Sequence, residues 1–171
     1  GCFHACAYCY ARRTHEYLGL GAGTDFERKI LVKPRAPELL EAAFRKPSWR
    51  GELVAFSGVT DCYQPLEASW KLTRGCLEVM GARPPAALVV QTRSPLVLRD
   101  AALIAALPHA GVSLTVTTAD EGVRRAFEPD SPSVARRIAT LAAWGVDGII
   151  PDSVDHVPAD SLPPPLPLPA A

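Results

Sequence analysis

Short apolar runs alternate with amphipathic segments along most of this chain. Three runs, at residues 52–57, 87–92 and 112–118, are rich in valine, leucine and threonine and have the length of strands. The first two are apolar almost throughout, which predicts strands that are buried on both faces. A fourth strand is expected at residues 146–150.

The segments between these runs carry apolar residues at helical spacing. One helix is predicted from Ala36, with Pro37 in its first turn, up to the break at Pro47. Strands that alternate with helices are typical of successive βαβ units, so the sheet should be parallel with right-handed crossovers. The pattern alone leaves a barrel and a doubly wound sheet open. Further helices are predicted at residues 66–80, 99–107, 120–127 and 134–144.

Length and composition predict one globular unit followed by a tail. The chain has 171 residues, about the size of a single domain. Residues 1–150 carry the alternating pattern, whereas residues 151–171 are rich in proline and are expected to be disordered. Because the chain begins with Gly1, we interpret it as a piece of a longer protein.

Charge and hydropathy exclude several classes of protein. With 48% hydrophobic and 21% charged residues, the composition is that of a soluble globular protein. No apolar stretch approaches the roughly 20 residues that cross a bilayer, so no membrane association is expected. Eighteen basic residues balance eighteen acidic ones, which removes the broad positive surface of a duplex-DNA-binding protein but leaves a local basic groove open.

Five cysteines, three of them within the first nine residues, indicate a metal or cluster site in a reducing compartment, and the cytoplasm is the expected location. Cys2, Cys6 and Cys9 form the pattern C-x3-C-x2-C. Structural zinc normally has four protein ligands, whereas three cysteines on a [4Fe–4S] cluster leave one iron free. The spacing favours the cluster. A Cys3His zinc module without catalysis, completed by His4 or His15, stays open as the alternative.

The same motif, with Tyr8 directly before the last cysteine, resembles the signature of the radical S-adenosylmethionine (SAM) enzymes. The runs CYARRTHEYLG, TDCYQPLE, TRSPLVLRD and AFEP further resemble the spore photoproduct lyase-like branch, and the resemblance covers about residues 1–144. It implies an α/β fold, an incomplete parallel (β/α)6 partial TIM-type barrel, with the cluster loop at the mouth. Residues 1–150 would then be a partial radical SAM domain that lacks the first and last strands.

The resemblance also implies a chemistry. The reduced cluster would cleave SAM to methionine and a 5′-deoxyadenosyl radical, which abstracts hydrogen from a substrate that the sequence does not identify. A DNA photoproduct is a candidate substrate only because of the name of the branch. An electron donor such as flavodoxin or ferredoxin is implied as a partner. Cleavage by residues 1–171 alone is expected to be weak or absent, because cofactor contacts would be missing.

Eight residues match positions at which the family contacts SAM. The loop after the first strand should meet the ammonium group, Arg93 the carboxylate where relatives have lysine, and two threonines the ribose. Most have a competing structural role: helix caps or turns for Asp61 and Thr60, strand packing for Thr115 and Thr117, a helix-end carboxylate for Glu128, and a core position for Tyr8. The predicted cofactor-binding residues are Tyr8, Gly58, Thr60, Asp61, Arg93, Thr115, Thr117 and Glu128.

Other polar residues near the motif are candidates for tuning the cluster. Hydrogen bonds or positive charge can raise the reduction potential of a cluster. The alternative is that these residues are solvated and have no such role. Cys62 is either a reactive thiol or a buried one, and Cys76 should be core and far from the cluster. The candidates that flank the cluster cysteines are His4, Arg12, Arg13 and His15.

Overall fold

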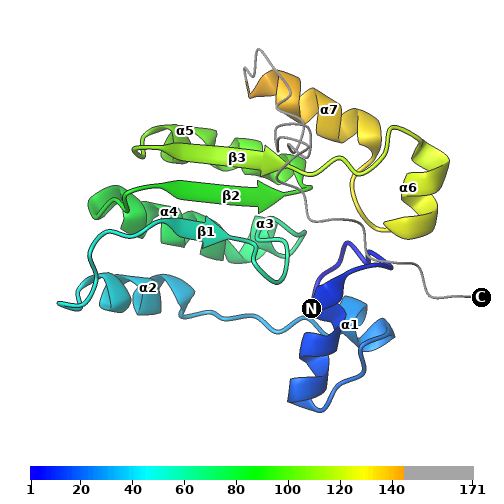
Figure 1. The fold of residues 1–171 in the computed structure, drawn as a ribbon, viewed down its shortest axis with the longest axis horizontal. Coiled ribbons are helices and arrows are strands. Elements are labelled where there is room, and N and C mark those ends of the chain that lie inside the picture. Colours follow the sequence, from blue (N-terminus) through cyan, green and yellow to red (C-terminus); the bar gives the residue numbers. More distant parts are fainter. Residues whose placement is uncertain (145–171) are drawn as a thin grey trace, which may run out of the picture.

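Three parallel strands form the sheet that organises this protein (Figure 1). The computed structural model describes residues 1–144. Strand β1 (Val54–Phe56) pairs with β2 (Leu88–Thr92), which pairs with β3 (Ala110–Leu114), so the sheet order follows the order in the chain. The predicted parallel order of these strands is confirmed. All three strands therefore point their carboxyl ends to the same edge of the sheet.

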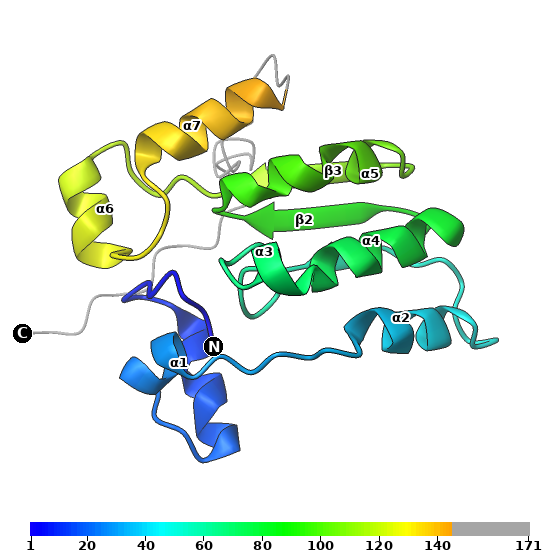
Figure 2. The same cartoon turned by 180° about the vertical axis from the view of Figure 1, so that it is seen from behind.

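Helices α4 (Leu72–Ala82) and α5 (Ala101–Ala105) cover one face of the sheet, as the view from behind shows (Figure 2). Their apolar residues enclose the core with the inward residues of β2. Helix α2 (Ala36–Phe44) packs against α4. The buried core contains Phe44, Tyr63, Leu77, Met80, Leu88, Val90, Val97, Ile104 and Leu107.

The remaining elements lie at the carboxyl edge of the sheet or connect it to the helices. The short helix α3 precedes α4, and a 3-10 helix leads into α5. The amino-terminal segment and the helices after β3 approach the strand ends (Figure 1). These elements are η1 (Tyr10–Leu18), α1 (Thr24–Arg28), α3 (Glu67–Trp70), η2 (Pro95–Asp100), α6 (Glu121–Phe127) and α7 (Val134–Ala143).

The expectation that the first two strands are buried on both faces is wrong for the described residues. Along β2, Leu88 and Val90 are buried whereas Val89 and Gln91 are exposed, and Ala55 at the centre of β1 is also exposed. The reason is that, within residues 1–144, helices lie on only one face of the sheet (Figures 1 and 2). The apolar runs thus include residues on an open face.

Two predicted helices differ from those observed. The helix expected at residues 66–80 is divided at Lys71, whose φ of 51° lies in the left-handed region. A second helix, α4, begins directly after Lys71. The Glu67 carboxylate stabilises its first turn by accepting from the backbone N–H groups of Thr73 and Arg74. The helix expected at residues 99–107 is preceded by a 3-10 turn from Pro95, since the Ser94 hydroxyl accepts from Leu96 N.

The third strand begins and ends earlier than residues 112–118. It starts at Ala110, directly after His109, whose φ is 49°. Its partner β2 ends at Thr92, and Thr115 N makes the last ladder bond, to Thr92 O at 2.9 Å. Residues beyond Thr115 therefore have no strand to pair with on that side and leave the sheet.

Several expectations concern residues outside the described range. These are the strand at residues 146–150 and the proline-rich tail at residues 151–171. Within the described part, no helix is long and apolar enough to span a bilayer.

Shortening one core side chain should show how much this core contributes. Leu77, on α4, is 1% exposed, so Leu77→Ala should lower the free energy of unfolding by about 2–5 kcal/mol, through lost burial and the cavity left behind. Leu39 on α2 is 58% exposed, and Leu39→Ala should change it by about 0.5 kcal/mol or less. Urea denaturation followed by circular dichroism compares the two. Equal losses would contradict this assignment of the core.

Candidate active site

The amino-terminal loop carries three free cysteines to the carboxyl edge of the sheet (Figure 1). Cys2 and Cys6 are only 8% and 7% exposed, and Cys9 is half-buried. Cys2 and Cys9 pack in one small apolar cluster with Ala11 and Phe26. The backbone closes the loop through Cys2 N to Phe26 O (2.9 Å) and Cys9 N to Cys6 O (3.3 Å). A single short loop thus carries all three thiols, two of which, those of Cys2 and Cys9, lie in one apolar cluster.

Arg12 holds this loop in shape. Its Nε donates to Cys6 O and its Nη2 to Ala5 O, both at 2.9 Å, while Nη2 also pairs with Glu27 Oε1 at 2.5 Å. The guanidinium carbon lies 5.5 Å from the centre of the Phe26 ring, within the range of a cation–π contact. Arg12, expected to tune a cluster electrostatically, fixes the backbone of the cysteine loop.

Burial affects the ionisation of the cysteine thiols. Burial raises the pKa of the Cys2 and Cys6 thiols, with the Arg93 charge opposing this at Cys6, so their thiolates need a positive partner. Among residues 1–144, no three His, Cys, Asp or Glu side chains are arranged around one ion. A cluster presents separate irons to its ligands, so three cysteines need not converge on one point.

Each histidine of the predicted zinc site has a hydrogen-bond partner at Nε2. His15 Nε2 lies 3.0 Å from Lys29 O, and its ring meets Phe26 edge-on. His4 Nε2 lies 3.1 Å from Asp61 Oδ2. The Nδ1 atom of His4 has no hydrogen-bond partner among the described residues, so His4 is still available as the fourth ligand of the Cys3His alternative.

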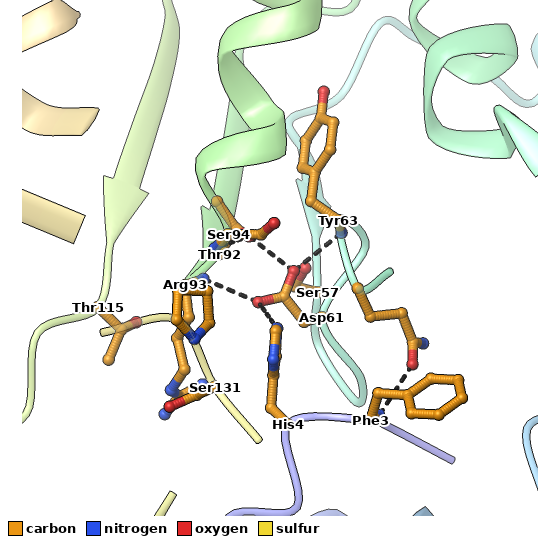
Figure 3. A network of polar contacts seen from close by, with 12 residues as sticks. Phe3, His4, Ser57, Asp61, Tyr63, Thr92, Arg93, Ser94, Thr115 and Ser131 are labelled. Carbon is orange, nitrogen blue, oxygen red and sulfur yellow. Dashed lines mark hydrogen bonds and ion pairs between the residues drawn. The ribbon is translucent and has the colours of Figure 1, made fainter. Parts of the chain in front are cut away.

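Asp61 joins the cysteine loop to the first two strands (Figure 3). Its Oδ1 accepts from Thr92 Oγ1 (2.6 Å) and Tyr63 N (2.8 Å), and its Oδ2 from Arg93 N (2.8 Å) and His4 Nε2. Burial opposes ionisation of this carboxyl, but the hydrogen bonds from His4, Thr92 and Arg93 leave its pKa below the ordinary value. Asp61 is thus a buried structural carboxylate beside the predicted site.

Glu128 is the centre of a second network, which lies between the cysteine loop and the helices after β3. Its Oε1 accepts from the Tyr8 hydroxyl, from Thr117 Oγ1 at 2.9 Å and from Arg93 Nε at 3.3 Å. Arg93 Nη2 also donates to the Tyr8 hydroxyl at 3.1 Å. Four of the eight predicted cofactor-binding residues therefore meet at one carboxylate.

The other oxygen of Glu128 faces the protein interior. Its Oε2 pairs with Arg137 Nη2 at 2.5 Å and accepts from Ser131 Oγ at 3.3 Å. Although burial alone would raise the pKa of Glu128, the bonds from Tyr8, Arg137 and Thr117 lower it to about 2. The carboxylate is therefore ionised at neutral pH and compensates two arginines.

The other predicted residues lie around these two networks. The Thr115 carbonyl accepts from Arg137 Nη1 at 3.2 Å, and the Gly58 carbonyl accepts from the Tyr10 hydroxyl. Thr60 is half-buried in the loop that leads from β1 to Asp61. The structure thus brings this set to the same edge as the cysteines, although Thr117 is exposed and beyond the end of β3.

The remaining cysteines lie elsewhere. Cys76 is buried on α4, as expected. Burial raises the pKa of the Cys62 thiol to about 12, which favours the inert thiol over the reactive one.

Sequence reasoning missed Arg137, whose side chain is almost fully buried. A signal was present, because Val134, Arg137 and Leu141 share one face of the predicted helix at residues 134–144. A charged residue on an apolar face predicts a buried partner of opposite charge. Here that partner is Glu128.

Comparison with known proteins identifies the superfamily of this chain. The model of the radical SAM superfamily matches residues 1–156, and the chain belongs to this superfamily. Members typically bind a [4Fe–4S] cluster and SAM.

Among curated proteins, an uncharacterized protein of Mycobacterium tuberculosis is 38% identical over 152 residues, which are 87% of this chain and 44% of that protein. An uncharacterized protein of Methanocaldococcus jannaschii is 33% identical over 164 residues, 91% of this chain and 60% of that protein. The chain therefore spans about half the length of these relatives. No solved structure matches it significantly.

Removing the charge of Glu128 should destabilise the protein. Glu128→Gln leaves buried Arg137 without its counter-ion, and we expect the free energy of unfolding at neutral pH to fall by about 3 kcal/mol. Because the pKa of Glu128 is about 2 in the folded protein, its stabilisation is complete above the ordinary value of 4.5 and is lost as pH falls toward 2. The difference between wild type and variant should therefore shrink over that interval.

Urea denaturation at a series of pH values measures this difference. Glu41→Gln is the matched control, because Glu41 forms only an exposed ion pair with Arg45 on α2. It should leave stability and its pH dependence almost unchanged. A Glu128→Gln variant as stable as wild type would show that the contacts of Glu128 do not stabilise the fold.

Proposed function

We propose that this chain is the core of a radical SAM enzyme, in which Cys2, Cys6 and Cys9 hold a [4Fe–4S] cluster and the strand-end residues bind SAM. The observation that carries the proposal is that the loop predicted to hold the cluster and the strand ends predicted to bind SAM contact each other at one edge of the sheet. Tyr8, from the cysteine loop, and Arg93, from the end of β2, share Glu128. His4 and Asp61 join the same two segments a second time.

A reduced cluster held by Cys2, Cys6 and Cys9 would supply the electron that cleaves the S–C5′ bond of SAM, which would give methionine and a 5′-deoxyadenosyl radical for hydrogen abstraction. The protein's own residues position the cofactor. Arg93 carries the positive charge for the SAM carboxylate, and its contacts with Glu128 and Tyr8 fix the plane of the guanidinium. Glu128 is ionised at neutral pH, and its carboxylate holds Arg93 at the edge of the proposed site.

The finer assignments extend this proposal. The motifs CYARRTHEYLG, TDCYQPLE and AFEP resemble those of the spore photoproduct lyase-like branch, and we propose that the three parallel strands belong to an incomplete (β/α)6 barrel. Flavodoxin or ferredoxin would donate the electron in the cytoplasm. The equal numbers of basic and acidic residues give no support to a DNA photoproduct as substrate, so the substrate is left open.

Cysteine substitution tests the cluster. After anaerobic reconstitution, the wild-type chain should contain iron and sulfide with a brown chromophore, and serine at Cys2, Cys6 or Cys9 should abolish both. Cys62→Ser and Cys76→Ser are the matched controls and should keep the cluster, because both thiols lie outside the loop. Stoichiometric zinc without sulfide would establish the Cys3His module instead. Loss of the cluster in Cys62→Ser but not in Cys2→Ser would overturn the ligand assignment.

SAM binding tests the role of Arg93. In the reconstituted chain, Arg93→Gln should weaken SAM binding by tenfold or more, since one charge-assisted hydrogen bond contributes about 1.5–3 kcal/mol. Arg93→Lys should recover part of the affinity because it keeps the charge. Arg50→Gln removes an exposed arginine remote from the strand ends and should not alter binding. Equilibrium dialysis with labelled SAM measures all three, and equal affinity in Arg93→Gln and wild type would contradict the assignment.

A further inference from the structure

The backbone on either side of Cys2 is held by the side chain of Gln64, to which the proposed function assigns no role. Gln64 lies in the loop after β1, within the run TDCYQPLE. Its Oε1 accepts from Phe3 N at 3.1 Å (Figure 3), and its Nε2 donates to Gly1 O at 3.3 Å. One amide group therefore satisfies both a donor and an acceptor of the backbone that flanks the first cysteine, as a neighbouring strand would.

The same segment is enclosed on a second side by the backbone near Phe26. Cys2 N donates to Phe26 O at 2.9 Å, and a Cβ at position 1 would lie only 2.6 Å from that oxygen. Glycine is the residue that permits such a close approach of two backbones. Each of three consecutive residues, Gly1, Cys2 and Phe3, thus has a backbone hydrogen bond to Phe26 or to Gln64.

Gln64 is itself fixed relative to the sheet. Its backbone N–H donates to Asp61 O at 3.4 Å, which closes a turn between the two residues. The Asp61 carboxylate is bound in turn to Thr92 Oγ1 and Arg93 N at the end of β2. The turn that carries Gln64 is therefore attached to the sheet edge, and the Gln64 amide connects Cys2 to that edge.

We propose that Gln64 is a positioning residue for the cluster, because its amide fixes the place of Cys2 relative to the strand ends. This proposal rests on the proposed function, since it requires a cluster bound to Cys2. Burial raises the pKa of the Cys2 thiol, whereas the backbone N–H groups of Asp61 and His4 lower it. Hydrogen bonds to cluster sulfurs raise the reduction potential. A displaced Cys2 would lose the alignment with these N–H groups.

Replacement of Gln64 in the reconstituted 171-residue chain tests this role. Gln64→Ala removes both hydrogen bonds, and Gln64→Glu keeps the acceptor for Phe3 N but places a carboxylate oxygen against Gly1 O. Both variants should lose iron to EDTA faster than wild type by about fivefold or more. A redox titration followed by electron paramagnetic resonance should give a more negative potential for both. Gln91→Ala is the matched control, because Gln91 is exposed on β2, and it should change neither value.

Alkylation distinguishes a loosened Cys2 from a general loss of structure. Iodoacetamide is added together with EDTA, and mass spectrometry gives the order in which the cysteines react. In wild type the half-buried Cys9 should react before the buried Cys2, whereas in Gln64→Ala Cys2 should react at least as fast as Cys9. Cys76, which is buried on α4, should stay protected in both. Faster reaction of Cys76 in Gln64→Ala would mean general destabilisation and would overturn the proposal.

The same measurements separate a failure of this proposal from a failure of the proposed function. A wild-type chain that holds no iron and sulfide after reconstitution would reject the cluster, and with it the role of Gln64. A wild-type chain that holds the cluster would retain the proposed function. In that case, unchanged iron release, potential and order of alkylation in Gln64→Ala would reject the role of Gln64 alone.

Discussion

The buried carboxylate of Glu128 is the interaction on which the arrangement of the site depends. It connects the cysteine loop through Tyr8, the end of β2 through Arg93, the segment after β3 through Thr117, and α7 through Arg137. A buried charge is tolerated only when it is paired and fully hydrogen-bonded, so the partners of Glu128 must all be in place together. The four segments can therefore adopt few other relative positions.

Asp61 is a second buried carboxylate that connects segments of the chain, here at the ends of β1 and β2. Its two oxygens bind His4 of the cysteine loop, Thr92 at the end of β2 and the backbone N–H of Arg93. Arg93 thus has its backbone held by one buried carboxylate and its side chain by the other. This double attachment fixes the position of a long side chain at the edge of the proposed cofactor site.

Much of this architecture follows from the sequence, and the exceptions have physical causes. The alternation of apolar runs with helical segments predicts parallel strands, and parallel strands bring Asp61, Arg93 and Thr117 to one edge. Pattern could not show that the sheet has helices on only one face within residues 1–144, because Val89 and Ala55 are as apolar as buried residues. Nor could it give the end of β3, which depends on where β2 stops at Thr92.

The centre of the polar network was predicted only in part. Glu128 was singled out through the resemblance, but its contact with Arg137 depends on how the α6–α7 connection folds back, which no local pattern encodes. The same is true of the His4–Asp61 pair, whose residues are 57 positions apart. Long-range pairs of single side chains leave little trace in one sequence.

The way Arg12 holds the cysteine loop has a consequence for metal delivery. In many small metal-binding domains the polypeptide is unfolded until the metal arrives, so ordering of the ligands reduces the affinity for the metal. Here the backbone carbonyls of Ala5 and Cys6 are fixed by a side chain of the protein itself. The conformational entropy of this loop would thus be lost when the polypeptide folds, and the proposed cluster would bind to a loop whose backbone already has its shape.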